Sequence, residues 1–353
     1  MTLPKPPDPN ILPGLGPMIS ETMTDQHGRS INYLRLSITD RCNLRCLYCR
    51  SSCTGLKMLP HEQMLSYEES LELITTASEL NISKVRLTGG EPFIRKNFLH
   101  FLEQILQRHP HLDMRLTTNA TLLSGKIPAL KEIGVQGLNI SLDTLDRQKF
   151  QRITGRDFFL QVRGAIDQCL EHGLRVKINV VALKGVNDDE LPDFVRLAER
   201  LPLDLRFIEF MPMGEKTVWT PDQLWTAAEI LREAGTIARL VPVEGRDKRK
   251  GPARMFSLAD GKGRIGVISP LSSHFCGQCN RLRITPDGRL RTCLFSDKEY
   301  RLRPILRSPK LGREHLRQVI IRAGRVKPMG HELLAAQGRE RSVCRKIMSA
   351  IGG

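Results

Sequence analysis

Short hydrophobic runs rich in β-branched residues alternate with longer amphipathic stretches from residue 33 to about residue 210. The short runs predict six strands, at Tyr33–Ile38, Lys84–Thr88, Asp113–Thr117, Gly137–Leu142, Arg175–Val181 and Leu205–Phe210. The amphipathic stretches predict five helices, at Tyr67–Leu80, Phe98–Arg108, Lys126–Ile133, Phe159–His172 and Asp188–Arg200. Repeated strand–helix units indicate a parallel sheet with right-handed crossovers. Six units are too few to close an eight-stranded barrel, so we expect an α/β fold with an open six-stranded (βα)6 partial barrel of the TIM type.

The pattern changes on both sides of this region. Residues 1–28 are rich in proline and glycine and lack a positive-then-apolar signal pattern, so we expect a disordered N-terminal extension. Residues 29–213 form the predicted barrel. Residues 214–353 combine a helical stretch at Thr220–Glu233 with a basic, glycine-bearing segment and short strands. This last part predicts a smaller C-terminal α+β region.

Polar and glycine-rich positions collect where the predicted strands end. They are the cysteine-rich loop after the first strand, Gly89–Pro92, Thr117–Asn119, Ser141–Asp143, Lys177 with Asn179, and Glu209–Pro212. Each alone has an ordinary explanation, since a glycine pair is often only a tight turn. Active sites of such barrels lie at the carboxyl ends of the strands. We therefore expect these positions to form one site.

The cysteine-rich loop carries Cys42, Cys46 and Cys49 in the spacing Cys-x3-Cys-x2-Cys. Iron–sulfur clusters are held by cysteine thiolates, normally four. Three thiolates in so short a loop would leave one iron of a [4Fe–4S] cluster open to another ligand, which indicates a catalytic cluster. The alternative is a structural zinc knuckle, for which Cys53 would be the fourth ligand.

A second group, Cys276, Cys279 and Cys293, has the spacing Cys-x2-Cys-x13-Cys. The turn residues Pro286-Asp287-Gly288 predict a hairpin that returns Cys293 to the other two cysteines. This group again has no obvious fourth cysteine. As a zinc ribbon it would be incomplete, although His274 could supply a nitrogen ligand.

Two arginines follow Cys279 at alternate positions, Arg281 and Arg283. In a strand, both side chains would face the same way, and Leu282 would face the opposite, buried side. We therefore expect both guanidinium groups to lie beside the second cysteine group.

The composition of the chain narrows the kinds of partner that it can bind. The chain of 353 residues is 40% hydrophobic, enough for a large α/β domain and a smaller one. No apolar run approaches the ~20 residues of a membrane span, and clustered cysteines suit a reducing, cytoplasmic location. The net charge of +16 indicates an anionic partner, either nucleic acid or a polyphosphate small molecule. Aromatic residues, at 5%, supply few stacking platforms for single strands.

These motifs resemble one family, the radical S-adenosylmethionine (SAM) GTP 3′,8-cyclases of molybdenum cofactor biosynthesis. The first cysteine loop, with Tyr48 before its last cysteine, and the Gly89-Gly90-Glu91-Pro92 segment resemble the radical SAM superfamily as a whole. The resemblance runs from about Arg29 to Gly353. It includes Leu34–Cys42, Val85–Pro92, Asn139–Asp143, Ile153–Arg156, Arg206–Met211, the second cysteine group and Ile351–Gly353.

The resemblance implies two [4Fe–4S] clusters, one on each cysteine group, and SAM bound to the open iron of the first. Reductive cleavage of SAM would give a 5′-deoxyadenosyl radical that takes a hydrogen from C3′ of GTP, after which C3′ attacks guanine C8. The open iron of the second cluster would contact the purine. The implied SAM contacts are Tyr48, Gly90, Glu91, Ser141 and Met211. The implied GTP contacts are Arg35, Arg86, Thr117, Lys177, Arg281, Leu282 and Arg283.

The resemblance also gives catalytic roles to Arg281, Arg283, Gly352 and Gly353. The two terminal glycines would reach the active site, since glycine lacks a side chain and accepts most dihedral angles. The alternative for them is a frayed chain end. The implied partners are an electron donor and a downstream cyclic pyranopterin monophosphate synthase. No membrane and no nucleic acid are expected, and a homodimer stays open.

The chain departs from the family pattern after the third cysteine, where Arg50-Ser-Ser-Cys53 replaces the usual Met-Pro. Two other functions also stay open. One is a different radical SAM enzyme that modifies RNA or a peptide. The other is a non-catalytic iron–sulfur or zinc module that binds nucleic acid through its basic surface. Iron and sulfide analysis of the anaerobically purified protein separates the module from the enzymes.

Overall fold

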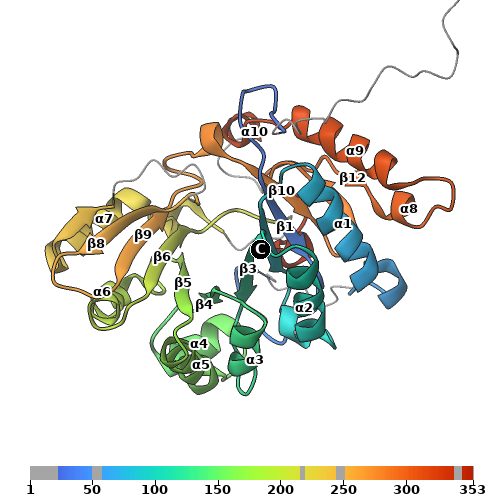
Figure 1. The fold of residues 1–353 in the computed structure, drawn as a ribbon. Coiled ribbons are helices and arrows are strands. Elements are labelled where there is room, and N and C mark those ends of the chain that lie inside the picture. Colours follow the sequence, from blue (N-terminus) through green and yellow to red (C-terminus); the bar gives the residue numbers. More distant parts are fainter. Residues whose placement is uncertain (1–22, 50–57, 215–218, 244–250, 338–343, 353) are drawn as a thin grey trace, which may run out of the picture.

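One twelve-stranded sheet organises the protein. The structure, a computed structural model, describes residues 23–49, 58–214, 219–243, 251–337 and 344–352. Its strands are β1 (Tyr33–Ser37), β2 (Lys84–Thr88), β3 (Asp113–Thr118), β4 (Gly137–Ser141), β5 (Arg175–Ala182), β6 (Asp204–Glu209), β7 (Leu240–Pro242), β8 (Arg254–Leu258), β9 (Arg264–Ile268), β10 (Arg281–Ile284), β11 (Arg289–Arg291) and β12 (Tyr300–Arg301). They lie in the order β12-β11-β10-β1-β2-β3-β4-β5-β6-β9-β8-β7, and the sheet curves through the molecule (Figure 1).

The middle of the sheet is parallel. Strands β1 to β6 pair in chain order, and their ends lie within one residue of the six predicted ranges. A mostly parallel α/β sheet is therefore confirmed. Two strands of the C-terminal part continue it in parallel, since β10 pairs with β1 and β9 pairs with β6. The six-unit barrel itself stays a prediction, because these two strands carry the parallel arrangement beyond six.

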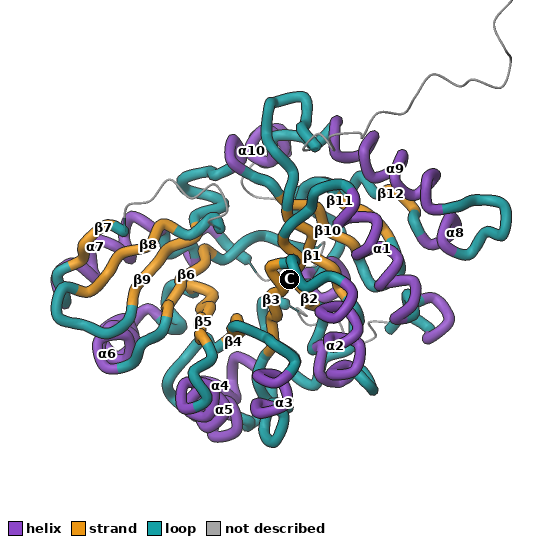
Figure 2. Tube along the Cα trace, in the orientation of Figure 1, coloured by secondary structure: helices purple, strands orange, loops and turns teal. Residues whose placement is uncertain are grey.

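Helices cover the outer side of the curved sheet, as the purple elements of Figure 2 show. They are α1 (Tyr67–Glu79), α2 (Phe98–Arg108), α3 (Ile127–Glu132), α4 (Arg147–Thr154), α5 (Phe159–Glu171), α6 (Leu191–Arg200) and α7 (Ala227–Ile237). The C-terminal part adds α8 (Arg303–Leu306), α9 (Arg313–Arg325), α10 (Gly330–Gln337) and α11 (Met348–Ile351), of which α9 contacts α1. Leucine, isoleucine, valine and phenylalanine side chains between the helices and the sheet form the main core.

Capping residues set several helix ends. Ser66 and Thr226 each form a capping box with the glutamate three residues later, at the starts of α1 and α7. The box at Thr226 explains why α7 begins later than the predicted helix Thr220–Glu233. Helix α4, which the sequence reading missed, starts at the N-cap Asp146 and ends at Gly155, whose φ is +70°.

Residues 23–28, which the sequence assigned to a disordered extension, pack against the rest of the chain. Met23 is buried, and Thr24 forms a β-bridge with Ser30. The backbone N–H of Gln26 donates to the carbonyl oxygen of Arg325 over 2.9 Å. The other predicted extension residues lie outside the described part of the chain.

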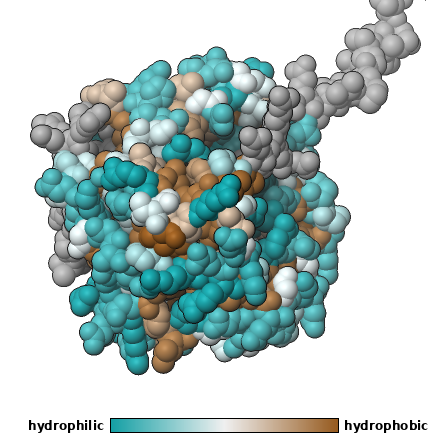
Figure 3. All heavy atoms as spheres, turned by 90° about the vertical axis from the view of Figure 1, so that its left-hand side faces the viewer, coloured by the Kyte–Doolittle hydropathy of each residue, from teal (hydrophilic) through white to brown (hydrophobic). Residues whose placement is uncertain are grey.

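The edge of the sheet farthest from the cysteine groups is β7. It has three residues and ends in Pro242, which has no N–H to offer another strand. Figure 3 looks onto this side of the molecule and shows hydrophobic residues gathered within a mainly hydrophilic face. Across the described ranges, no helix combines the length and apolarity that crossing a membrane requires.

Candidate active site

A cavity of about 1640 Å³ is lined by both cysteine groups and by residues of the parallel strands. Most of the predicted site residues line it together. They are Arg35, Cys42, Cys46, Tyr48, Cys49, Arg86, Gly90, Thr117, Ser141, Lys177, Met211, Cys276, Cys279, Arg281, Arg283 and Cys293. Glu91, Leu282 and Gly352 are not among the lining residues, and Gly353 lies outside the described residues.

The first cysteine loop is held by backbone contacts with the end of α4. The N–H groups of Arg45 and Leu47 donate to the carbonyl oxygens of Thr154 and Ile153, over 2.8 and 3.0 Å. The Cys42 sulfur accepts from the Leu44 N–H at 3.4 Å and from the side-chain amide of Asn119 at 3.7 Å. Hydrogen bonds of this kind to sulfur are among the factors that tune iron–sulfur clusters.

The glycine pair after β2 packs directly on this loop. A side chain at Gly90 would place its Cβ 2.1 Å from the carbonyl oxygen of Arg41, and one at Gly89 would lie 2.6 Å from that of Thr39. Glycine is therefore required here by the cysteine loop itself. Glu91 is fully buried, and its carboxylate accepts from Phe93 N–H, Thr118 Oγ1 and Asn119 N–H. Its side chain thus joins the glycine segment to the end of β3 and is not among the groups that line the cavity.

Tyr48 is fixed by an acid that the sequence reading did not single out. Its hydroxyl donates to Asp143 Oδ2 at 2.6 Å, and Asp143 Oδ1 accepts from the Val181 N–H at 2.8 Å. Burial raises the pKa of Asp143 to about 6, although both donors favour the carboxylate. Asp143 therefore joins the first cysteine loop to the ends of β4 and β5.

Four arginines form one row across the sheet. Arg115, Arg86, Arg35 and Arg283 are successive register partners on β3, β2, β1 and β10, and all line the cavity. Register partners face the same side of a sheet, so these guanidinium groups lie close to one another. Burial, and then the neighbouring Arg281, lower the pKa of Arg283 to about 10. An anion with several negative charges would relieve this repulsion.

The hydroxyl groups of Tyr33 and Thr117 orient Arg86, in the middle of this row. Arg86 donates through Nε to the Tyr33 hydroxyl at 2.5 Å and through Nη1 to Thr117 Oγ1 at 3.0 Å. Burial alone would raise the pKa of Tyr33, but Arg86 and Arg35 lower it to about 7. The alternation of polar residues in β3 was the one sequence signal that could have revealed Arg115.

Lys177 has the partner that its place in an apolar strand required. Its ammonium lies 3.6 Å from Asp204 Oδ2, and Arg206 shares the same oxygen at 3.3 Å. Burial, and then Arg206, lower the pKa of Lys177 to about 8, while Asp204 opposes the shift. Lys177 and Arg206 thus extend the cationic lining along β5 and β6.

The second cysteine group lies on the predicted hairpin, now observed as antiparallel β10 and β11. Cys276 and Cys293 are close together, because a Cβ at Gly330 would lie 3.4 Å from one sulfur and 3.1 Å from the other. Burial alone would raise the pKa of Cys279, but Arg281 and Lys327 lower it to about 6. Cys279 is therefore suited to the thiolate form that ligates iron.

The C-terminal tail ends against Arg283 and the end of β1. Gly352 is buried with φ +84°, and its carbonyl oxygen accepts from Arg283 Nη1 at 3.2 Å. A side chain there would place its Cβ 2.6 Å from Cβ of Ser37. Figure 1 accordingly marks the chain end at the centre of the sheet.

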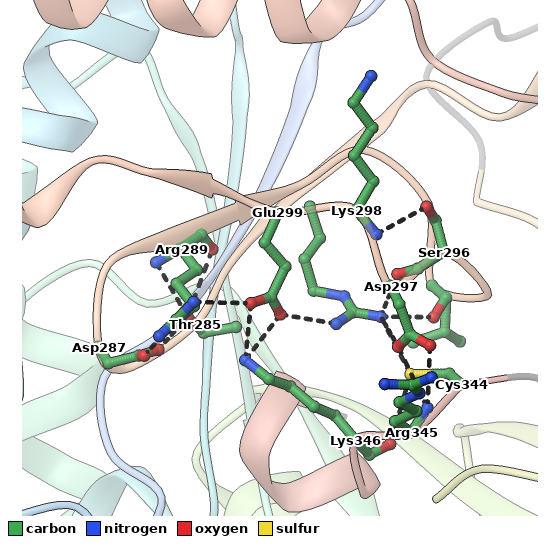
Figure 4. A network of polar contacts seen from close by, with 12 residues as sticks. Thr285, Asp287, Arg289, Ser296, Asp297, Lys298, Glu299, Cys344, Arg345 and Lys346 are labelled. Carbon is green, nitrogen blue, oxygen red and sulfur yellow. Dashed lines mark hydrogen bonds and ion pairs between the residues drawn. The ribbon is translucent and has the colours of Figure 1, made fainter.

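Charged side chains on β11 and on the following segment hold this tail (Figure 4). Glu299 accepts from Arg291 and Lys346, each at 2.7 Å, and from Arg289 at 3.3 Å. Arg291 is fully buried, and its Nη2 lies 3.0 Å from the Cys344 sulfur. We refer to Glu299, Arg289, Arg291, Cys344 and Lys346 as the tail clamp.

The donor sets of both groups suit iron–sulfur clusters, whose ligands are thiolates. Each group offers three sulfurs to one cavity, and the first also receives N–H donors. In the described part of the chain, no set of three His, Cys, Asp or Glu side chains is arranged to hold a single metal ion. Cys53 lies outside the described residues. His274 is exposed, and its Nδ1 lies 2.8 Å from the Pro270 carbonyl oxygen.

Comparison with known proteins assigns the chain to a family. Residues 36–198 match the radical SAM superfamily, and residues 203–333 match the family described as Molybdenum Cofactor Synthesis C. The GTP 3′,8-cyclase of Syntrophomonas wolfei subsp. wolfei is 43% identical over 335 residues, which cover 94% of this chain and 100% of that protein. The chain belongs to the GTP 3′,8-cyclase family. The cyclase of Thermodesulfovibrio yellowstonii is 42% identical over 333 residues, with the same coverage.

Solved structures agree with the radical SAM fold of this cyclase family. The crystal structure of Streptococcus suis SuiB has a TM-score of 0.57 at 13% identity and covers 86% of this chain and 68% of that one. SuiB bound to S-adenosylmethionine has a TM-score of 0.56 at 12% identity, covering 86% and 66%. As a radical SAM enzyme of the cyclase family, the chain uses SAM and a [4Fe–4S] cluster.

Proposed function

We propose that this protein converts GTP into 3′,8-cyclo-7,8-dihydro-GTP, the first step of molybdenum cofactor biosynthesis, in the cavity between the two cysteine groups. The observation that carries the proposal is the row of four arginines, which runs from the barrel strands to β10, beside the second cysteine group. A triphosphate supplies the charge that such a row requires, and guanidinium groups bind phosphate oxygens in pairs.

The first cysteine group would hold the cluster and SAM. Cys42, Cys46 and Cys49 ligate the cluster, with Asn119 donating to the Cys42 sulfur. When bound, the cluster would supply one electron that cleaves SAM to methionine and a 5′-deoxyadenosyl radical, and this radical would take the C3′ hydrogen of GTP and leave as 5′-deoxyadenosine. The C3′ radical would then bond to C8, and one further electron from the separate donor, with a proton, would complete the 7,8-dihydro product. Tyr48, Ser141 and Met211 line the SAM side of the cavity. Gly90 and Glu91 receive the SAM amino group through backbone oxygens, since three donors already occupy the Glu91 carboxylate.

GTP would lie across the cavity from SAM. Arg35, Arg86, Arg281, Arg283, Thr117 and Lys177 hold its phosphates and ribose. Leu282 contributes through its backbone, because its side chain is fully buried on the other face of β10. Cys276, Cys279 and Cys293 would hold a second [4Fe–4S] cluster, whose open iron would bind the purine. Gly352 and Gly353 close the site at the chain end.

The remaining assignments concern the whole protein. Residues 29–213 carry the SAM chemistry and the GTP contacts on β1, β2, β3 and β5, and residues 214–353 carry the second cluster, the GTP contacts on β10 and the Gly-Gly tail. The protein works in the cytoplasm, receives electrons from a separate donor, and passes its product to a cyclic pyranopterin monophosphate synthase. A homodimer is compatible with these roles.

An anaerobic assay with GTP, SAM and dithionite tests the function. We expect both 5′-deoxyadenosine and a cyclised nucleotide. The Cys49→Ala variant should form neither, while the Cys53→Ala variant should retain both products. Normal SAM cleavage by Cys49→Ala would refute the assignment of the first cluster.

Metal analysis tests the number of clusters. Two [4Fe–4S] clusters predict about eight irons per chain, and the Cys42→Ala, Cys46→Ala, Cys49→Ala triple variant should keep about four. Zinc in place of iron would instead support the non-catalytic module.

A further inference from the structure

Lys327 is a fully buried lysine whose donors all meet the segments that carry the second cysteine group. Its relative exposure is 1%. Its ammonium donates to the carbonyl oxygen of Arg281 at 3.0 Å and to that of Thr292, which precedes Cys293. Arg281 is two residues after Cys279, so these two contacts fix the chain on both sides of the β10–β11 hairpin that joins Cys279 to Cys293. A lysine ammonium has three N–H donors and no acceptor, so one donor remains for the sulfurs of the group.

The residues after Lys327 meet two sulfurs of the group. Gly330 has no side chain where Cys276 and Cys293 approach, and an added Cβ would lie 3.4 and 3.1 Å from their sulfurs. The segment 327–331 therefore lies against Cys276 and Cys293, and Lys327 binds the start of the strand that follows Cys279.

Arg29 braces this segment from the opposite end of the chain. Its guanidinium donates to the carbonyl oxygens of Lys327 and Cys276, both at 2.8 Å, and it is itself paired with the buried Asp25 at 2.6 Å. The position of Lys327 relative to the cysteines is thus fixed from two sides.

A simpler interpretation is that Lys327 only satisfies two buried carbonyl oxygens. Two neutral donors would suffice for that, and burying an ammonium is costly without a negative partner. Among the ion pairs of the described residues, none joins Lys327 to a carboxylate. The carbonyl oxygens that Lys327 binds, those of Arg281 and Thr292, belong to the segments that carry Cys279 and Cys293, so the negative charge available to it is that of these thiolates.

We propose that Lys327 is a positioning residue for the second cluster. It holds Cys279 and the Cys293 segment in place, and its positive charge raises the reduction potential of the cluster. The inference rests on the proposed second cluster. A nearby cation stabilises the reduced cluster, which carries one more negative charge than the oxidised one, and hydrogen bonds to the sulfurs act in the same direction. Outer-shell residues of this kind tune a metal site without binding the metal.

Redox titration of the second cluster alone tests the proposal. The full chain is prepared with Cys42, Cys46 and Cys49 replaced by alanine, and the cluster is followed by electron paramagnetic resonance. Lys327→Met, which keeps the length of the side chain, should lower the midpoint potential by at least 59 mV, the one-electron equivalent of a tenfold change. Lys149→Met is the matched control, because Lys149 is also buried but lies on α4 and pairs with Asp189 and Glu190, just before α6. Its potential should equal that of the parent.

Each result decides the question. An unchanged potential in Lys327→Met with about four irons present would overturn the role of Lys327 but leave the second cluster standing. Absence of iron from the parent that retains Lys327 would overturn both, and the iron count distinguishes the two failures. If Lys327→Met loses its iron, Lys327→Gln is measured in the same way. If both variants lose their iron but their apoproteins melt at the same temperature as the parent apoprotein, the result supports the proposal. If the apoproteins are unfolded, Lys327 stabilises the fold and the proposal is overturned.

Discussion

At the scale of single residues, the site is built by placing like charges together. Neutral groups orient the middle of the arginine row, and the carboxylates of Asp113 and Asp204 pair with cations in and beside it. Arg86 is oriented by Tyr33 and Thr117, and Arg283 is turned toward the chain end by Gly352. The electrostatic repulsion between the four arginines persists until an anion binds to them. Residues of the row should therefore affect substrate affinity more than the stability of the fold.

Arg283→Ala should weaken GTP binding by roughly one to two decades, because a charge-assisted contact in a largely dry site contributes ~1.5–3 kcal/mol. Equilibrium dialysis of GTP against the iron-replete protein measures the effect. Arg232→Ala, on the exposed surface of α7, is the control and should bind GTP like the parent. Equal affinity of Arg283→Ala and the parent would remove Arg283 from the GTP site.

Gly352→Ala should uncouple SAM cleavage from cyclisation. The positive φ alone costs an L-residue ~1–2 kcal/mol, and the new Cβ would also collide with Ser37. We expect at least a tenfold drop in cyclised product per 5′-deoxyadenosine, and the same for deletion of Gly352 and Gly353. Gly164→Ala in α5, where a Cβ meets no atom within 4 Å, should leave this ratio unchanged.

Glu91 should make the apoprotein less stable as the pH rises. Burial raises its pKa from 4.5 to about 7, so between these values the unfolded chain loses the proton first. Stability is therefore full below pH 4.5 and falls by up to ~3 kcal/mol as the pH passes 7. Urea unfolding at several pH values measures this slope. Glu91→Gln should flatten it, and an equally steep slope in that variant would assign it to other groups.

At the scale of elements, two segments far apart in sequence complete the site. The β10–β11 hairpin brings in the second cysteine group, and the tail clamp fixes the segment from Cys344 to Gly352. Glu299 compensates three cations of the clamp at once. Its carboxylate is the single group on which the docking of the tail depends most.

Glu299→Gln should release the tail. Removing one member of a buried ion-pair network leaves charges uncompensated and typically costs ~3–5 kcal/mol. Hydrogen exchange of residues 344–352 should become faster, and cyclised product should fall while 5′-deoxyadenosine persists. Glu233→Gln, whose partner Arg232 is exposed on α7, should change neither. Unaltered exchange in Glu299→Gln would show that the tail is held by its apolar contacts.

The sequence predicted elements whose signal is local and missed those that depend on distant contacts. Hydrophobic alternation located β1 to β6, and Pro286-Asp287-Gly288 located the hairpin turn. Helix α4, with the short capped sequence Arg147–Thr154, lacks a long apolar stripe. Lys327 could not be recognised, because its partners Arg281 and Thr292 lie far from it in sequence. Asp143 was placed at the end of a strand, but its bond to the distant Tyr48 was not foreseen. Glu91 was expected at the ligand, since a motif does not reveal which way its side chain turns.

At the scale of the whole molecule, one sheet passes through both functional parts of the chain. The division at residues 213 and 214 separates their chemistry, but β10 and β9 of the second part pair with β1 and β6 of the first. The core on the helical side likewise includes side chains from both parts. Neither part can therefore cover all the strand edges that are paired in the intact protein.

A fragment of residues 29–213 should consequently fail to fold as a stable monomer. It would expose the full edges of β1 and β6, which in the intact chain are covered by β10 and β9. We expect low soluble yield and no cooperative urea transition, measured by circular dichroism. A chain that ends at residue 337 keeps both covering strands and should unfold cooperatively. A cooperative transition in the shorter fragment would show that the first part is self-sufficient.

The pairing of β1 with β10 also sets a condition on synthesis at the ribosome. Strand β1 is complete at Ser37, but its neighbour is complete only at Ile284, which is 247 residues later (284 minus 37). At typical translation rates of about 5–20 residues per second, the nascent chain waits roughly 12–50 s before this edge can be covered. During that interval β2 can pair with one edge of β1, but the edge that β10 will cover stays open, and an open edge can recruit other chains. We therefore expect chaperones that bind nascent chains to raise the folding yield of this protein. The effect should be larger than for a barrel whose neighbouring strands are consecutive in sequence.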